Sequence, residues 1–259
     1  MNQEERRVYL IQYLLNEDSQ YEDISIPKNA FDQKKLLRAL MNVRIPKPIS
    51  NQFLTVQDAY LKEEIERKGI VSIDDLDEIQ KDLYVWQGDI TTLKCDAIVN
   101  AANSQMLGCF CPNHGCIDNV IHTYAGIQLR LKMNEIMSLQ QTLEETGKAK
   151  ITPAYNLPCQ YILHTVGPIV HGVVTDKDKK DLKNCYRSCL ELAEKAGLKS
   201  IAFCCISTGE FHFPNDLAAQ IAIETVMEYK RKTASEMKVI FNVFKSLDKQ
   251  IYTDLLGSD

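Results

Sequence analysis

From residue 81 onward, short apolar runs rich in β-branched and aromatic residues alternate with helical patterns. The runs that predict buried strands are Leu83–Trp86, Ala97–Val99, Tyr161–Val166, Ile201–Ile206 and Val239–Phe244. Amphipathic stretches lie between them, such as the one from Asp181 to Gly197. Apolar strands that alternate with helices form a central sheet covered on both faces. The sequence therefore predicts a three-layer α/β/α domain over residues 81–259.

Residues 1–80 show a different pattern, which is helical and charged and predicts no strand. Asp32 is placed to cap a helix, and a further helix is predicted from near Asn51 to Gly69. The apolar stripes of these helices are too long to be left in water. We therefore expect an N-terminal helical extension that docks on the domain formed by residues 81–259.

Composition limits the partners that such a chain can have. It carries 30 Lys and Arg against 35 Asp and Glu, a net charge of −5, whereas nucleic-acid binding relies on a basic face. No stretch approaches the ~20 apolar residues of a membrane span, and the first residues lack the features of a signal peptide. We expect a cytoplasmic protein with no nucleic-acid or membrane partner, whose nine cysteines stay reduced.

The densest group of metal-ligating residues is Cys109-x-Cys111-x2-His114-x-Cys116. A folded loop can bring three of these side chains to one zinc ion, at distances of ~2.0 to ~2.3 Å. A closed structural site requires four ligands, and Cys111 can serve as the fourth. From spacing alone, a three-ligand site with an open position, a closed structural knuckle and a set of buried thiols all stay open.

Other polar residues follow the predicted strands, where α/β sheets tend to bind ligands. Asp89 can accept a hydrogen bond from an exocyclic amine such as that of adenine, or it can cap a turn. The stretch Ser207–Phe213 lies between a strand and a helix, so its backbone N–H groups can bind a pyrophosphate. Phe244 ends the last strand, and from the pattern alone it is expected to pack in the core.

Four motifs, Gly88-Asp89-Ile90, Asp96–Asn103, Thr165–Pro168 and Ile206–Gly209, occur here in an order that resembles the macrodomain family of ADP-ribose binders and hydrolases. The loop Gly108–Asn119 is similar to that of the zinc-dependent branch of this family. The resemblance implies a mixed central sheet. It also implies zinc (Zn²⁺) as cofactor, held by Cys109, His114 and Cys116.

The same resemblance assigns roles to individual residues. It places Asn103 and Asp118 at the distal ribose as catalytic residues, where the acid binds a ribose hydroxyl or orients the attacking water. The implied substrate-binding residues are Asp89, Ile90, Asn103, Ser207, Thr208, Gly209, Glu210, Phe211 and Phe244.

The function implied is a zinc-dependent hydrolase that removes mono-ADP-ribose from modified proteins, through cleavage of the link to an acidic side chain. The implied partners are ADP-ribose and an ADP-ribosylated protein, of which a lipoyl-carrier protein modified by a sirtuin-like transferase is one example. Three alternatives stay open. They are a reader that binds ADP-ribose without cleaving it, an O-acetyl-ADP-ribose deacetylase and a structural zinc module.

Overall fold

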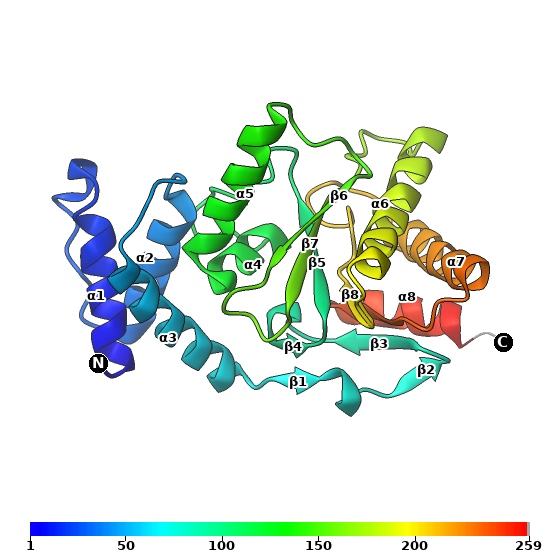
Figure 1. Ribbon diagram of the computed structural model, residues 1–259, viewed down its shortest axis with the longest axis horizontal. Helices are drawn as coiled ribbons and strands as arrows, with labels where there is room; N and C mark the ends of the chain where they lie inside the picture. Colours follow the sequence, from blue (N-terminus) through cyan, green and yellow to red (C-terminus); the bar gives the residue numbers. More distant parts are fainter. Residues whose placement is uncertain (258–259) are drawn as a thin grey trace.

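The computed structural model describes residues 1–257 and contains a seven-stranded sheet between helices (Figure 1). The strands, in spatial order, are β2 (Glu78–Gln80), β3 (Leu83–Gln87), β9 (Lys238–Val243), β8 (Ser200–Phe203), β5 (Ala97–Ala102), β7 (Tyr161–Val166) and β6 (Ala149–Pro153). The two edge strands β2 and β6 pair antiparallel with their neighbours, and all other pairs are parallel. The predicted mixed sheet is confirmed, and all five predicted strands belong to it.

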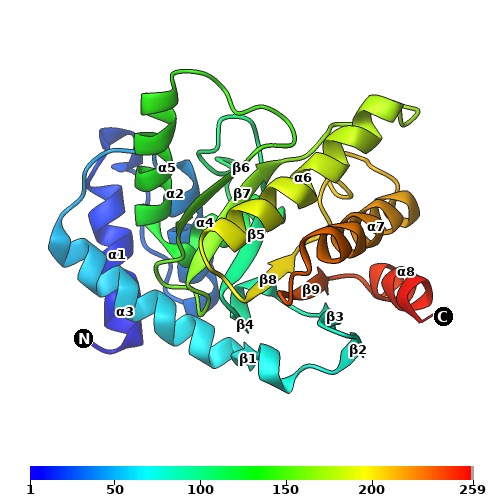
Figure 2. The same cartoon turned by 45° about the vertical axis from the view of Figure 1, so that its right-hand side comes forward.

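Helices cover both faces of this sheet (Figure 2). They are α4 (Ile117–Ala125), α5 (Ile127–Gln140), α6 (Asp176–Lys195), α7 (Asn215–Thr233) and α8 (Ser246–Leu256). Successive side chains of β7 point to opposite faces of the sheet and so contact different helix layers. His164 lies beside His122 of α4, whereas Thr165 faces Cys185 of α6. Helices α6, α7 and α8 pack side by side in the second layer. The three-layer α/β/α arrangement is therefore confirmed.

The N-terminal part forms α1 (Gln3–Leu15), the short 3-10 helix η1 (Ser19–Tyr21), α2 (Ala30–Val43) and α3 (Asn51–Lys68). These helices enclose an apolar core of their own, which includes the fully buried Leu10 and Phe53. Ile127 of α5 completes this core, so the extension packs directly on the first helix layer of the sheet domain. In Figure 1 the extension lies beside α4 and α5, at the left of the molecule.

Two details of the N-terminal prediction are wrong. Helix α2 is capped by Asn29, whose Oδ1 accepts a hydrogen bond from the Asp32 N–H at 2.9 Å, so Asp32 lies in the first turn. The region before residue 81 also contains strands: β1 (Val71–Ser72) pairs with β4 (Leu93–Lys94), and β2 joins the main sheet. Strands of two or three residues carry too few alternating positions to be recognised from sequence. The domain boundary at residue 80 remains a prediction.

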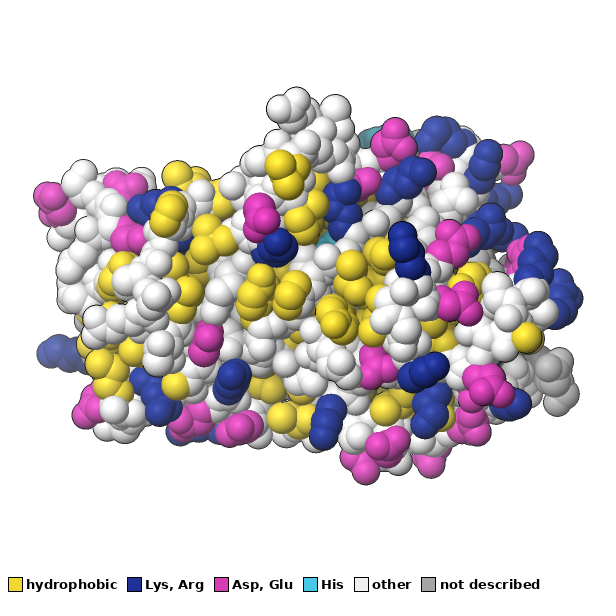
Figure 3. Space-filling model, viewed as in Figure 1, with side chains coloured by type: hydrophobic (Ala, Val, Ile, Leu, Met, Phe, Trp, Pro, Cys, Tyr) yellow, Lys and Arg dark blue, Asp and Glu magenta, His cyan; other side chains and the backbone are white. Residues whose placement is uncertain are grey.

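No helix within residues 1–257 is long and apolar enough to cross a membrane. The face shown in Figure 3 carries basic and acidic side chains together, and the basic ones gather most densely toward the α6 and α7 end.

Candidate functional site

A cleft of about 640 Å³ opens at the carboxyl ends of the parallel strands β3, β5, β8 and β9. Each strand delivers a segment to its wall, namely Gly88–Ile90 after β3, Ala101–Asn103 at the end of β5, Ser207–Phe211 after β8, and Asn242 with Phe244 at the end of β9. The loop and helix start from Cys109 to Val120 close another side. Parallel α/β sheets bind ligands at this edge, so the cleft is the candidate site.

Asp89 lines the cleft and makes two sets of contacts. It caps the 3-10 helix η3 (Ile90–Thr92), where its Oδ1 accepts hydrogen bonds from the Thr91 N–H at 3.0 Å and the Thr91 hydroxyl at 2.6 Å. Its Oδ2 accepts from Lys68 at 2.8 Å. Burial acts to raise the pKa of Asp89, but the Lys68 and Thr91 hydrogen bonds outweigh it and hold this pKa below its usual value. The carboxylate is therefore ionised and faces the cleft.

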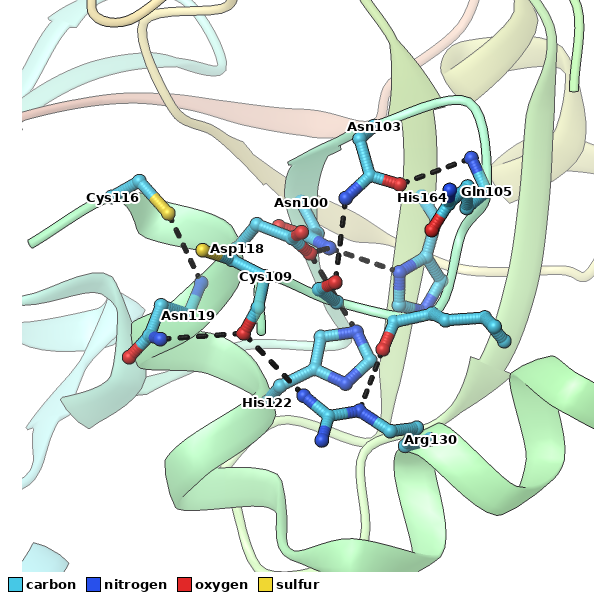
Figure 4. Close-up of polar contacts among 12 residues, drawn as sticks. Asn100, Asn103, Gln105, Cys109, Cys116, Asp118, Asn119, His122, Arg130 and His164 are labelled. Carbon is cyan, nitrogen blue, oxygen red and sulfur yellow. Dashed lines mark hydrogen bonds and ion pairs between the residues drawn. The ribbon is translucent and has the colours of Figure 1, made fainter. Parts of the chain in front are cut away.

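The amides of the Asn100–Asn103 segment differ in position. Asn103 lines the cleft, with its Nδ2 donating to the Gly108 carbonyl at 3.3 Å and its Oδ1 accepting from the Gln105 N–H at 3.0 Å. Asn100 is fully buried behind the cleft wall and donates to Asp118 at 2.8 Å (Figure 4). Asn100 therefore orients Asp118, while Asn103 is placed to meet a ligand.

Asp118 lies in the first turn of α4 and lines the cleft although only 4% of its surface is exposed. Burial raises its pKa to about 6, against the lowering effects of the Asn100 hydrogen bond and the Arg130 charge. His122 is one helical turn further on, with its Nε2 at 3.6 Å from the Asp118 carboxylate. Figure 4 shows Asn100, Asp118 and His122 close together.

Cys109, His114 and Cys116 form the one group within residues 1–257 whose side chains could together hold a metal ion. Their ligand atoms lie within 4.8 Å of one another, and all three residues line the cleft. Cys111 is exposed and lies outside this group. Two thiols and an imidazole are a donor set that zinc prefers. Burial raises the pKa of Cys116 to about 12, so a cation is needed for this thiol to ionise.

The stretch Ser207–Phe213, which we call the substrate loop, is tightly curled. The N–H of Phe213 donates to the Ser207 carbonyl at 2.9 Å, and that of His212 donates to the Gly209 carbonyl at 3.1 Å. Ser207 has a φ of 66°, in the left-handed region, and is buried. All of the predicted residues Ser207, Thr208, Gly209, Glu210 and Phe211 line the cleft. Their backbone is therefore close enough to meet an anion there.

The remaining predicted residues also lie at the cleft. Ile90 lines it with 2% of its surface exposed. Phe244 also lines it and is 77% exposed, so the expectation that Phe244 packs in the core is wrong. The structure thus brings every predicted binding and metal residue to one cavity.

Sequence reasoning missed two basic residues of the cleft that come from the extension. Lys68 ends α3, pairs with Asp89 and lies over the Tyr124 ring, 3.4 Å from its centroid. Arg38 of α2 lines the cleft beside the metal group. A charged residue on a helix surface is usually solvated, so nothing in the sequence distinguishes these two from their neighbours.

The chain is similar to known proteins over most of its length. Residues 99–222 match the Macro domain family. A protein-ADP-ribose hydrolase of Treponema medium is 55% identical over 99% of this chain and 100% of its own length. One of Staphylococcus aureus (strain MRSA252) is 49% identical over 98% of this chain and 96% of its own.

Solved structures agree with these relatives. A Trypanosoma brucei macrodomain in complex with ADP-ribose is 26% identical, with a TM-score of 0.67 over 89% of this chain and 97% of its own. Because relatives at 49% and 55% identity span nearly the whole chain and the fold agrees, this chain belongs to the macro domain family.

Proposed function

We propose that this chain is a zinc-dependent hydrolase that removes mono-ADP-ribose from modified proteins. One observation carries the proposal: a single cleft is lined by an ionised Asp89, by the donor group Cys109, His114 and Cys116, and by the buried Asp118. The relatives named protein-ADP-ribose hydrolase support the reaction. A module that only reads ADP-ribose has no use for a metal group beside the ligand.

The adenosine and pyrophosphate parts of the ligand are held by groups of opposite character. Asp89 accepts a hydrogen bond from the adenine amine, and the exposed Phe244 ring offers a face on which adenine stacks. The buried Ile90 side chain lines the same cleft. The N–H groups of the substrate loop bind the pyrophosphate, which lets an acidic chain hold an anionic ligand without a basic patch.

Asn103 and Asp118 act at the distal ribose. The bond broken joins ribose C1″ to the carboxylate oxygen of an acidic side chain on the modified protein. Water supplies the hydroxyl that ends on C1″, the protein carboxylate leaves with the electrons of the broken bond, and the second proton of the water is released to solvent. Asp118, held by Asn100, either binds a ribose hydroxyl or orients this water. When bound by Cys109, His114 and Cys116, zinc supplies Lewis acidity at this end of the cleft.

The substrate in this proposal is a protein that carries mono-ADP-ribose on Glu or Asp. A lipoyl-carrier protein modified by a sirtuin-like transferase remains the predicted example. The same chemistry at the distal ribose would also allow hydrolysis of O-acetyl-ADP-ribose, so the assay must include both substrates.

Mutations should affect turnover and ADP-ribose binding separately. With a glutamate-modified protein as substrate, Asp118→Ala should lower turnover by about a hundredfold or more, since it removes a group that acts on the reacting ribose. This variant should keep its zinc and its affinity for ADP-ribose. Asp89→Ala should instead weaken ADP-ribose binding more than about tenfold, because it removes a charge-assisted hydrogen bond worth roughly 1.5–3 kcal/mol.

The readouts are release of ADP-ribose, followed by mass spectrometry, and calorimetric titration with free ADP-ribose. Asp176→Ala, which changes a fully exposed carboxylate on α6, is the control. A wild-type protein that binds ADP-ribose but releases none from the modified protein would overturn the proposal in favour of the reader. Release confined to O-acetyl-ADP-ribose would favour the deacetylase.

A further inference from the structure

The loop that carries the three donor residues has little backbone structure of its own. This loop, residues 107–116, which we call the metal loop, contains a turn in which the His114 N–H donates to the Cys111 carbonyl at 3.3 Å. Its other backbone groups bond mainly to side chains from three helices. A metal site requires donor atoms fixed to within a few tenths of an ångström, so these side chains decide how well the donors are placed.

Arg38 of α2 is the first of them. Its guanidinium donates to the carbonyl of His114 at 2.7 Å and to the Asn119 side-chain oxygen at 2.8 Å. Asn119, which is fully buried, donates in turn to the carbonyls of Cys111 at 2.9 Å and Cys109 at 3.4 Å. The Arg38 guanidinium therefore positions the backbone of His114 directly. Through Asn119 it also positions the carbonyls of Cys109 and Cys111.

Asn42, one helical turn further along α2, holds the other side of the same loop segment. Its side-chain oxygen accepts from the N–H of Asn113 at 3.0 Å, and its Nδ2 donates to the Thr123 hydroxyl at 3.0 Å. Asn113 directly precedes His114 and has a φ of 55°, in the left-handed region. The contact from Asn42 fixes the backbone at the point where it turns to present His114.

Arg130 of α5 makes hydrogen bonds both to the end of α2 and to the start of the metal loop. One of its nitrogens donates to the carbonyls of Met41, Asn42 and Arg44, at 3.1, 2.7 and 2.7 Å. Its Nε donates to the Leu107 carbonyl at 2.7 Å. The N-terminal extension is thus hydrogen-bonded directly to the Asn113–His114 end of the metal loop, and Arg130 links it to the Leu107 end.

We propose that helix α2 of the extension is part of the metal site, with Arg38 and Asn42 acting as positioning residues for the donor group Cys109, His114 and Cys116. The inference rests on the proposed zinc site. It assigns the extension a function in metal binding, in addition to its packing on the sheet domain. Arg38 offers the sharper test, because it is only partly buried and one of its bonds ends directly on the carbonyl of the donor residue His114.

The test uses the full chain and zinc itself. Arg38→Met should weaken zinc binding by about 10- to 100-fold, the range expected when a partner that orients a ligand residue is lost. The dissociation constant is measured by competition with a chelator of known affinity. Arg38→Lys keeps the charge but loses the fork, so its zinc affinity should fall between those of the wild type and Arg38→Met. Arg67→Met is the matched control, because within residues 1–257 the ion pairs of Arg67 are with Glu63 and Glu64 of its own helix, away from the metal loop.

A second readout reports geometry rather than affinity. In cobalt-substituted protein, the visible absorption bands should change in position or intensity in Arg38→Met and stay unchanged in Arg67→Met. Equal zinc affinity and equal cobalt spectra in wild type, Arg38→Met and Arg38→Lys would overturn the inference while leaving the zinc site itself intact. Wild-type protein that binds no zinc would overturn the proposed function, and this inference with it. If Arg38→Met fails to fold, Arg38→Lys decides between these outcomes.

Discussion

Single residues in this site combine a structural and a ligand-facing role. Asp89 caps η3 and also lines the cleft, so its predicted cap role is confirmed, while its role in binding adenine stays a prediction. Its pairing with Lys68 could not be foreseen, because the two residues come from different parts of the chain and meet only through packing. In the proposed complex with ADP-ribose, the ionised Asp89 carboxylate would be shared between Lys68 and the adenine amine.

Behind Asp118, a chain of buried polar side chains crosses into the sheet. Asn100 lies 3.1 Å from His164 Nδ1, and the Thr152 hydroxyl lies 3.0 Å from His164 Nε2 (Figure 4 shows the first contact). His164 is fully buried, and its burial lowers its pKa from 6.5 to about 3. The imidazole is therefore neutral in the folded protein at all physiological pH values.

This neutral histidine predicts a pH dependence of stability. Below pH 6.5 the unfolded chain takes up a proton that folded His164 does not, so stability is lost as the pH falls toward the folded pKa of about 3. Between pH 7.5 and 5 the loss from this one residue should be about 2 kcal/mol. His164→Gln should remove that part of the loss. Urea denaturation of both proteins at the two pH values measures it, and equal losses in both would contradict the assignment.

At the scale of elements, the segment after β7 packs closely against the substrate loop, which is proposed to bind the pyrophosphate. Gly167 follows β7 and lies against the substrate loop. A Cβ at this position would be 2.0 Å from Ser207 Oγ and 2.9 Å from Ile206 Cγ2. Only a residue without a side chain lets the two segments approach this closely.

Gly167→Ala should therefore displace the substrate loop and weaken binding of ADP-ribose. We expect at least a tenfold loss of affinity by calorimetry, the equivalent of about 1.4 kcal/mol. Ser207→Gly removes the clashing hydroxyl and suits the positive φ at this position, so the double variant should regain part of the affinity. Wild-type affinity in Gly167→Ala, or no recovery in the double variant, would show that this contact does not control the loop.

How much of the fold the sequence predicts depends on burial. The central strands β5, β7, β8 and β9 are buried on both faces and mostly apolar, so each shows an apolar run and all are predicted. The edge strand β6 is mostly half-buried and interrupted by Lys150, so it shows no such run. Helix α5 buries Arg130 beside Leu129 and Met133, and this charged residue on its inner face obscures the helical pattern.

For the whole molecule, the main difference between sequence and structure is the role of the extension. Its helical nature can be predicted from apolar spacing, but its contacts with the cleft cannot. Arg38 and Lys68 are ordinary surface charges until α2 and α3 pack beside α4. The motif residues of the cleft, in contrast, come directly after strands or at the first turn of helices. Their order in the sequence is therefore enough to place them at one edge of the sheet. The extension therefore contributes two basic residues to the cleft, Arg38 and Lys68, that the family motifs do not include.

The central claim is that hydrolysis depends on a metal held by Cys109, His114 and Cys116. The most direct test measures turnover of a glutamate-modified protein by the metal-stripped, still-folded chain and by the same sample after zinc is restored. Removal should lower the rate by a factor of hundreds, the scale of losing a principal electrostatic stabiliser at ~3–4 kcal/mol, and zinc should restore it. Affinity for free ADP-ribose should change by no more than several-fold. A fully stripped, folded protein that works at the native rate would contradict the claim.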